Sequence, residues 1–250
     1  MNNQDAFLAR TRSALGKVRE NARPQDAKNG YFTSEADDAL LTLLDGRHRT
    51  RDEQLDLLAV LKESAGPLNL QVHEVATMAD AAEGIVGIAR TTDTEWGGNK
   101  QITTHDTPFM AELDLAARLK NDGIAVEVSS LQPGEDELAG KQRLREQAIA
   151  SYIGVTGGDW CAVDCGALVI LAGPGKARAT SLVPSVHIAV LRLDQLTADL
   201  TEIYAHFKER GELPISVNFI SGPSKTADIE ATLVHGAHGP REMHIFVVTD

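Results

Sequence analysis

The sequence predicts an α/β fold in which a mostly parallel, Rossmann-like sheet is flanked by helices. From residue 67 onward, short apolar runs typical of strands alternate with segments of helical periodicity, which is the pattern of layered α/β domains. The run at Ala167–Leu171 contains no polar residue, as expected for a strand that is buried on both faces. Residues 215–219 alternate like a strand and residues 245–248 form another apolar run. We expect these two to be a parallel pair joined by a right-handed crossover.

The composition is that of an ordinary globular protein with an acidic balance. The 250 residues are 42% hydrophobic and 24% charged, which suits one α/β domain with an appendage. The formal net charge of −12 argues against a general nucleic-acid binder. The sequence shows no secretory signal and no stretch long enough to span a membrane. With only two cysteines there is no disulfide framework, so a cytoplasmic location is expected.

We expect residues 1–33 to form a helical arm with a linker, ahead of one α/β domain that spans residues 34–250. Residues 4–20 place their apolar side chains on one side of a helix, and residues 21–33 contain Pro24 and Gly30, as linkers often do. Such an arm can pack on its own domain or on a neighbouring copy. The sequence therefore leaves a homo-oligomer open.

Capping signals and periodicity predict the elements of the domain. Thr50 with Glu53 and Thr77 with Asp80 form capping boxes, in which each side chain satisfies a backbone N–H of the first helical turn. Helices are expected from residue 50 through 61 and over residues 77–89, 107–120, 135–149 and 195–208. Strands are expected over residues 70–75, 124–128, 153–156, 167–171 and 180–191. A loop is expected over residues 91–100.

The stretch at residues 221–226, Ser-Gly-Pro-Ser-Lys-Thr, is the expected ligand-binding turn. A helix is predicted over residues 227–234, so Ser224 or Thr226 would cap it and its free N–H groups would face outward. Such a helix end suits an anion, with Lys225 as a counter-charge. Because ligands bind beyond the carboxyl ends of parallel strands, we expect the turn to lie there and to face a cleft.

Gly222 and two acids complete this turn. Gly222 allows a ligand to approach the backbone closely, which favours a binding site. Asp228 and Glu230 fall in the first turn of the expected helix, where they either belong to the site or only compensate the helix dipole. The alternative interpretation is therefore a well-capped helix without a ligand.

The segment at residues 235–240, His-Gly-Ala-His-Gly-Pro, places two imidazoles at the far end of the expected helix. A glycine C-cap accounts for Gly236, and a histidine in the last turn accounts for His235. Helix chemistry gives no reason for His238 and Gly239, so we expect them to serve a ligand or a partner. Two histidines fall short of the three or more ligands that a metal site needs, so no metal is expected.

The motif pair GPSKTADIE at residues 222–230 and LVHGAHGP at residues 233–240 resembles the lactate-utilisation protein C family (LutC/YkgG), whose members carry a LUD domain. The resemblance extends to residues 164–167, where family members have an acidic-Thr-Gly-Thr turn, and to a Leu-Pro segment before the strand that contains His187. It implies the fold shared with ribose-5-phosphate isomerase, glucosamine-6-phosphate deaminase and CoA transferases.

The chain departs from the family pattern at one turn. Asp164 keeps the acid and Gly166 keeps the turn, but Cys165 and Ala167 replace both hydroxyl residues. The candidate ligand-binding residues are Gly222, Ser224, Lys225, Thr226, Asp228, Glu230, His235, Gly236, His238, Gly239, Asp164, Gly166 and His187.

The resemblance implies a component of an L-lactate utilisation system, which oxidises L-lactate to pyruvate and in which this chain acts with iron–sulfur partner proteins and binds a small anionic ligand. Cys161 and Cys165 cannot hold a cluster unaided, because a cluster normally needs four thiolates. We therefore expect no cofactor bound directly to this chain. Two alternatives stay open: a free-standing enzyme on a phosphosugar, folate or CoA-ester substrate, and a non-catalytic scaffold subunit.

Overall fold

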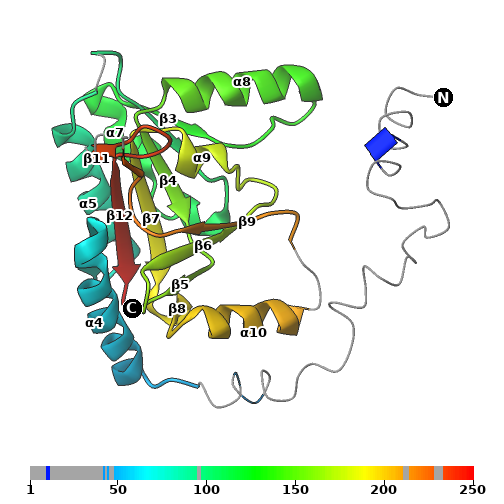
Figure 1. The fold of residues 1–250 in the computed structure, drawn as a ribbon. Coiled ribbons are helices and arrows are strands. Elements are labelled where there is room, and N and C mark those ends of the chain that lie inside the picture. The colour runs from blue at the N-terminus through cyan, green and yellow to red at the C-terminus, as the bar shows by residue number, and fades with distance from the viewer. Residues whose placement is uncertain are drawn as a thin grey trace.

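The computed structural model describes residues 48–94, 97–210, 214–227 and 233–250, together with the single residues 10, 11, 42 and 44. Within these ranges the chain forms a six-stranded sheet, a four-stranded sheet and a separate hairpin, with helices around them (Figure 1). The predicted α/β class with a mostly parallel sheet is confirmed. Residues 10 and 11 are helical, and the rest of the expected arm and linker lies outside the described residues.

Six strands form the main sheet, and every pair in it is parallel. They are β1 (Leu70–Val75), β2 (Gln101–Thr104), β3 (Ala125–Val128), β4 (Ile153–Gly157), β7 (Val186–Arg192) and β12 (Glu242–Val248). Their order across the sheet is β1-β12-β7-β4-β2-β3. All six carboxyl ends therefore lie at one edge of the sheet, and all six amino ends lie at the other.

The second sheet is mixed and has the order β8-β5-β6-β9. Its strands are β8 (Leu196–Thr197), β5 (Trp160–Ala162), β6 (Ala167–Leu171) and β9 (Val217–Ile220). β5 and β6 form an antiparallel hairpin, and β9 pairs antiparallel with β6. A separate antiparallel hairpin joins β10 (Lys225–Ala227) to β11 (Leu233–His235).

Helices connect and cover these strands. They are α4 (Arg51–Leu68), α5 (Met78–Thr91), α6 (Pro108–Ala111), α7 (Leu115–Leu119), α8 (Glu137–Ala150), α9 (Ala179–Leu182) and α10 (Leu200–Arg210), with short 3-10 helices η1 (Lys120–Asp122) and η2 (Leu193–Gln195). Both predicted capping boxes are confirmed: the Thr50 hydroxyl accepts from the Glu53 N–H at the start of α4, and the Thr77 hydroxyl accepts from the Asp80 N–H at the start of α5.

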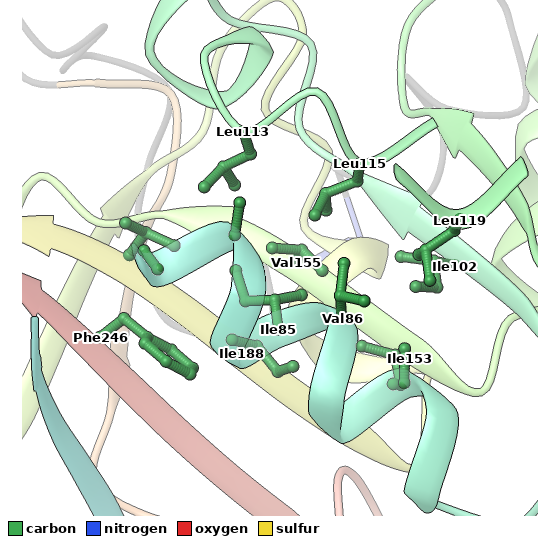
Figure 2. Packing of buried hydrophobic residues seen from close by; sticks show 14 of the residues in the cluster. Ile85, Val86, Ile102, Leu113, Leu115, Leu119, Ile153, Val155, Ile188 and Phe246 are labelled. Carbon is green, nitrogen blue, oxygen red and sulfur yellow. The ribbon is translucent and has the colours of Figure 1, made fainter. Parts of the chain in front are cut away.

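The two faces of the main sheet bury separate apolar clusters. On one face, α5, α6 and α7 pack against β2, β4, β7 and β12. Figure 2 shows Ile85 and Val86 of α5 in this cluster, with Ile153, Ile188 and Phe246 from the strands. On the other face, α4 and the second sheet pack against β7 and β12, and α10 packs on the second sheet in its turn. The central strands are thus held from both sides, which gives the loops at their ends a rigid base.

The helix expected over residues 227–234 is wrong. Ala227 ends β10, while Leu233 and Val234 belong to β11, and the two strands pair antiparallel. A short run of spaced apolar residues fits one side of a helix and also a pair of short strands, so periodicity alone could not decide. Residues 228–232, which include Asp228, Ile229 and Glu230, lie outside the described residues.

The expected parallel pairing of β9 with β12 is also wrong. β9 lies in the second sheet, whereas β12 lies between β1 and β7 in the main sheet. The turn at residues 221–226 therefore does not lie at the carboxyl end of a central parallel strand. A Cβ added to Gly222 would lie 2.9 Å from the Leu68 carbonyl oxygen, and Ser224 N–H donates to the Pro240 carbonyl at 2.7 Å. Leu68 and Pro240 each lie two residues before a strand of the main sheet, β1 and β12, so the turn lies beside the amino edge.

Several element boundaries differ from the expectation. The helix expected over residues 107–120 divides into α6 and α7, because Asp114 between them adopts a left-handed conformation with φ +46°. The strand expected over residues 180–191 begins as α9 and becomes β7 only at Val186. The segment at residues 195–208 first forms β8 and becomes helical at Leu200. The short strands β2, β5 and β8 were not expected.

Candidate functional site

The carboxyl ends of β2, β4 and β7 surround a pocket of about 390 Å³. We call it the carboxyl-edge pocket, and it is lined by His105, Thr107, Phe109, Gly157, Gly158, Asp159, Lys176, Arg192, Asp194 and Gln195. His105 follows β2, Gly157 ends β4 and Arg192 ends β7, while Lys176 comes from the loop after β6. Ligands of open α/β sheets bind at this edge, so this pocket is the first candidate for a functional site.

An ion pair fixes one cation of the carboxyl-edge pocket. Lys176 Nζ lies 2.6 Å from Asp159 Oδ2, and the same oxygen accepts the Leu171 N–H at 2.8 Å. The Lys176 and Asp159 side chains are 20% and 21% exposed, so the pair is partly sheltered from water. A lysine ammonium has three N–H donors, so its bond to Asp159 leaves donors for a ligand.

The Gly-Pro-Gly-Lys turn at residues 173–176 holds Lys176 in place. Gly175 has a φ of +70°, and a Cβ added there would lie 2.2 Å from the Asp106 carbonyl oxygen. The Asp106 N–H donates to the Gly175 carbonyl at 2.8 Å, which fastens the turn to the segment that follows β2. Only glycine fits this contact, and the contact fixes the position of the lysine beside it.

Arg192 supplies a second cation from the end of β7. Its side chain is 52% exposed, and its guanidinium carbon lies 5.0 Å from the centroid of the Phe109 ring. The Glu112 carboxylate is 3.6 Å away, at the rim. Gln195 donates to the carbonyls of residues 158–159 and accepts the backbone N–H of Arg192 at 2.7 Å. The loop that carries Arg192 is therefore tied to the one that carries Asp159.

Several polar side chains are buried around the main sheet: His105 lines the carboxyl-edge pocket, His187 is the second residue of β7, and Thr180 belongs to α9. Thr156 Oγ1 is 2.8 Å from His187 Nε2 on the neighbouring strand. His105 Nδ1, His187 Nδ1 and Thr180 Oγ1 are buried and have no hydrogen-bond partner among the described residues. Each such atom costs about 1–3 kcal/mol. Because folded proteins keep few of them, the one on His105 favours a function at the carboxyl-edge pocket that this residue lines.

The two histidines in this group are neutral at pH 7. Burial, together with a smaller effect of the nearby Lys176 charge, lowers the pKa of His105 to about 4. Burial lowers the pKa of His187 to about 3, with smaller contributions from His105 and His244. The cations of the carboxyl-edge pocket are therefore Lys176 and Arg192 and not imidazolium, and two carboxylates, Asp159 and Asp194, share the lining with them.

None of the described sequence-predicted site residues lines the carboxyl-edge pocket, and His187 is buried near the amino end of β7. Residues 164–166 form the turn between β5 and β6, and the Cys165 carbonyl accepts the Ser221 hydroxyl at 2.7 Å. Lys225 Nζ lies 3.4 Å from the Pro67 carbonyl near the end of α4. The structure thus brings the Asp164–Gly166 turn and the turn at residues 221–226 together, but on the side of the molecule away from the carboxyl-edge pocket.

A second pocket, of about 530 Å³, lies at the amino edge of the main sheet. We call it the amino-edge pocket, and its lining includes Gly236, Ala237, His238 and Gly239, and also Ser151, Ser185 and Arg241, which come shortly before β4, β7 and β12. Three predicted ligand residues, Gly236, His238 and Gly239, therefore share one pocket. His235 lies in β11, and Thr226 lies in β10 opposite Val234.

Neither a metal centre nor a membrane span is found in the described part of the chain. No three His, Cys, Asp or Glu side chains gather there in a group that could hold a metal ion. No helix in the same ranges is long and apolar enough to cross a bilayer. Burial raises the pKa of the Cys161 thiol, and desolvation with the nearby Asp164 raises that of Cys165, so both thiols are protonated at neutral pH.

The family model of the LUD domain matches residues 58–248, a span that contains both sheets and both pockets. The chain belongs to the LUD domain family. The resemblance inferred from the motif pair at residues 222–240 is thereby confirmed.

Curated relatives match most or all of this LUD-domain chain. Lactate utilization protein C of Shouchella clausii is 29% identical over 99% of this chain and 98% of the relative. The protein of the same name from Geobacillus kaustophilus is 31% identical over 79% of this chain and 80% of the relative. The uncharacterized protein YkgG of Escherichia coli is 27% identical over the full length of both.

A solved structure shares the fold. A DUF162 family protein from Deinococcus radiodurans has a TM-score of 0.52 and 18% sequence identity, and the match covers 78% of this chain and 98% of that one. At this identity the match shows the fold alone. It supports the arrangement of strands and helices described above.

Sequence reasoning missed His105, Asp159, Lys176 and Arg192. A signal was present in part, because the Gly157–Gly158 pair follows a buried strand, and glycines at the carboxyl end of such a strand favour a ligand site. The four residues lie far apart in the sequence, and strand order alone brings them together. No local spacing could have connected them.

Proposed function

We propose that this chain is a component of an L-lactate utilisation system and binds a small carboxylate in the carboxyl-edge pocket. The role in lactate utilisation is supported by relatives that carry that name and match 99% and 79% of the chain. The anionic ligand is supported by the geometry of the pocket and is assigned to residues other than those predicted from the sequence.

The observation that carries this proposal is a fixed pair of cations at the carboxyl edge. Lys176 is held by Asp159, and Arg192 is held at the end of β7, both beside the short Gly157–Gly158 turn. Ammonium and guanidinium donors bind carboxylates by charge-assisted hydrogen bonds, which are stronger than neutral ones. Gly157 and Gly158 also line the pocket, and packing requires glycine at residue 158, because a Cβ there would lie 2.5 Å from Cδ2 of Leu191. L-Lactate and pyruvate both have the required carboxylate.

We further propose that the oxidation chemistry lies on iron–sulfur partner proteins. Cys161 is fully buried in β5, and its neighbour Cys165 is the only other cysteine of the chain. Two thiols, one of them enclosed in a core, do not make a cluster site. This chain would then present its carboxylate ligand to a redox partner, or organise the assembly.

Growth and binding measurements with the same variants test the proposal. In a strain whose own copy of this gene is replaced, Lys176→Ala and Arg192→Ala should slow growth on L-lactate and leave growth on glucose unchanged. In the purified protein, ligand-observed NMR should show that each change weakens L-lactate binding about tenfold, because each removes a charged hydrogen-bond donor. Lys141→Ala and Arg51→Ala remove exposed cations from α8 and α4 and should have no effect in either assay.

The two parts of the proposal can fail separately. If a strain that lacks the gene grows on L-lactate as well as its parent, the role in lactate utilisation is wrong. If the deletion slows growth but both pocket variants grow and bind L-lactate like the unmodified protein, the role stands and the carboxyl-edge pocket is not its site.

A further inference from the structure

We propose that the amino-edge pocket is a second ligand site, which takes a molecule with one anionic group, carboxylate or phosphate, and a short apolar body. This proposal does not depend on the role in lactate utilisation, since it concerns the opposite edge of the main sheet. At about 530 Å³ the pocket falls within the range of about 300–1,000 Å³ that small-molecule sites occupy.

The loop at residues 236–239 is built into this edge by backbone hydrogen bonds. The Gly236 N–H donates to the Ser224 carbonyl at 3.0 Å, and the Ser224 N–H donates to the Pro240 carbonyl at 2.7 Å. The Arg241 N–H donates to the Ser185 carbonyl at 2.8 Å, which fastens the loop to the segment before β7. The loop therefore presents its groups from a fixed position.

Glycine is required where this loop turns. Gly236 has a φ of +78°, and a Cβ added there would lie 2.9 Å from the Cβ of Arg241. His238, by contrast, is exposed and has no hydrogen bond to any described residue. The loop thus holds an imidazole at the pocket without using it for the fold.

Hydrogen-bond donors of the pocket come from three directions. His238 lies on the loop, Asn99 precedes β2, and Arg241 precedes β12 with its Nε 3.4 Å from Glu242 Oε1. The described residues that line the pocket include no Asp or Glu, although the chain has 36 acidic and 24 basic residues. A guanidinium, an imidazole and a carboxamide suit an anionic group, with Glu242 as the acid that lies beside the guanidinium.

The remaining wall of the pocket is apolar and exposed. Ile149 at the end of α8 is 66% exposed, and Leu182 and Val183 at the end of α9 are 45% and 48% exposed. Each is a large hydrophobic side chain that has not been removed from water. A ligand whose apolar part covered them would gain about 25 cal/mol for each Å² that it buried. The cationic and the apolar walls together define the ligand class. A bare ion would contact only the cationic wall, and an uncharged chain would contact only the apolar one.

Binding of four simple probes tests this inference. Isothermal titration calorimetry with hexanoate and hexyl phosphate should show binding, whereas hexanol, which lacks the charge, and acetate, which lacks the body, should bind at least about tenfold more weakly. Arg241→Gln and His238→Ala should each weaken hexanoate binding by about tenfold or less, and Leu182→Ser should reduce hexanoate binding but not acetate binding.

Matched variants test whether the loss of hexanoate binding is specific to the amino-edge pocket. Arg51→Gln and His48→Ala change exposed residues of the same types away from the pocket and should leave hexanoate binding unchanged. Lys176→Ala at the carboxyl edge should also leave it unchanged. The melting temperature of His238→Ala should remain nearly that of the parent, since exposed substitutions shift stability by about 0.5 kcal/mol at most, whereas the core change Ile245→Ala should lower it clearly.

Two results would overturn the inference. One is that hexanoate and hexyl phosphate bind no better than hexanol and acetate. The other is that the anions bind but that Arg241→Gln, His238→Ala and Leu182→Ser all bind hexanoate like the parent while retaining their melting temperatures, which would place the anions elsewhere.

Discussion

Burial lowers the pKa of individual histidines of this LUD domain. His105, His187 and His244 are 2%, 1% and 5% exposed. Burial lowers the pKa of His105 and His244 to about 4 each, since a buried imidazolium loses its hydration. His244 Nδ1 lies 3.1 Å from His73 Nε2, and the neighbouring ring adds to the effect. Their contribution to stability therefore depends on pH.

We predict that stability falls between about pH 6.5 and pH 4. In the folded state the pKa of His105 is about 4, below its ordinary value of 6.5, so the unfolded chain binds the proton first as the pH drops. The stabilisation is full above pH 6.5 and is lost progressively down to pH 4, at roughly 3 kcal/mol for His105 alone. Urea unfolding at pH 7.0, 6.0, 5.0 and 4.5 measures this loss as a decrease in the free energy of unfolding.

A variant separates this effect from that of carboxylates. His105→Gln cannot titrate, so its free energy of unfolding should depend less steeply on pH over this window. The ion pair of Glu135 with Arg143 holds the pKa of that carboxyl at about 2, and its contribution is lost only between pH 4.5 and 2. An unfolding free energy that stays constant from pH 7 to 4.5 would contradict the histidine assignment.

At the scale of elements, the short helix α9 packs directly against the backbone of the main sheet. A Cβ added to Gly154 of β4 would lie 1.7 Å from the carbonyl oxygen of Thr180 in α9. The backbone of a helix reaches the backbone of a strand here, with no side chain between them. This contact fixes α9 against the main sheet. It thereby holds Leu182, the last residue of α9, and Val183, which follows it, at the amino-edge pocket.

We predict opposite effects for alanine at two glycines. Gly154→Ala should destabilise the protein by about 3 kcal/mol or more, because the backbone of α9 must move to admit the methyl group. Gly87→Ala lies in the exposed interior of α5 with no atom within 4 Å of the new Cβ, and should stabilise by about 1 kcal/mol or less through helix propensity.

Thermal unfolding by circular dichroism measures both changes. If Gly154→Ala has the melting temperature of the parent, α9 does not lie against β4 as described. The Gly87→Ala variant serves as the control for the substitution itself.

At the scale of the whole molecule, two sheets share one core and leave the cysteines unsuited to a cluster. Cys161 packs between the second sheet and the main sheet with Leu168, Ala189 and Ile245. Any metal-ligating role for this thiol would require the two sheets to separate. This packing supports the proposal that the iron–sulfur clusters lie on partner proteins.

We predict that the purified protein contains no iron–sulfur cluster. Iron and acid-labile sulfide measured on a sample prepared without oxygen should both be far below one atom per chain, because a cluster normally needs four thiolates and this chain has two. The Cys161→Ala and Cys165→Ser double variant serves as the background control. Stoichiometric iron and sulfide that disappear in this variant would show that the cysteines hold a cluster.

The sequence by itself determined the features that depend on neighbouring residues. The capping boxes at Thr50 and Thr77 involve a hydroxyl and an acid three residues apart, so they could be read without knowing the fold. The buried run at Ala167–Leu171 formed a strand for a similar reason, because its composition suits only a covered position. The motif pair at residues 222–240 was enough to indicate the family.

Only the tertiary structure decided the pairing of strands and the position of the sites. Residues 225–235 became a hairpin and not a helix, and β9 joined β6 and not β12, because strand pairing depends on partners far along the chain. The same long-range pairing brought His105, Lys176 and Arg192 to one edge of the main sheet. It placed His238 at the opposite, amino edge. In a parallel sheet all carboxyl ends share one edge and all amino ends share the other, whatever the separation of the strands in sequence.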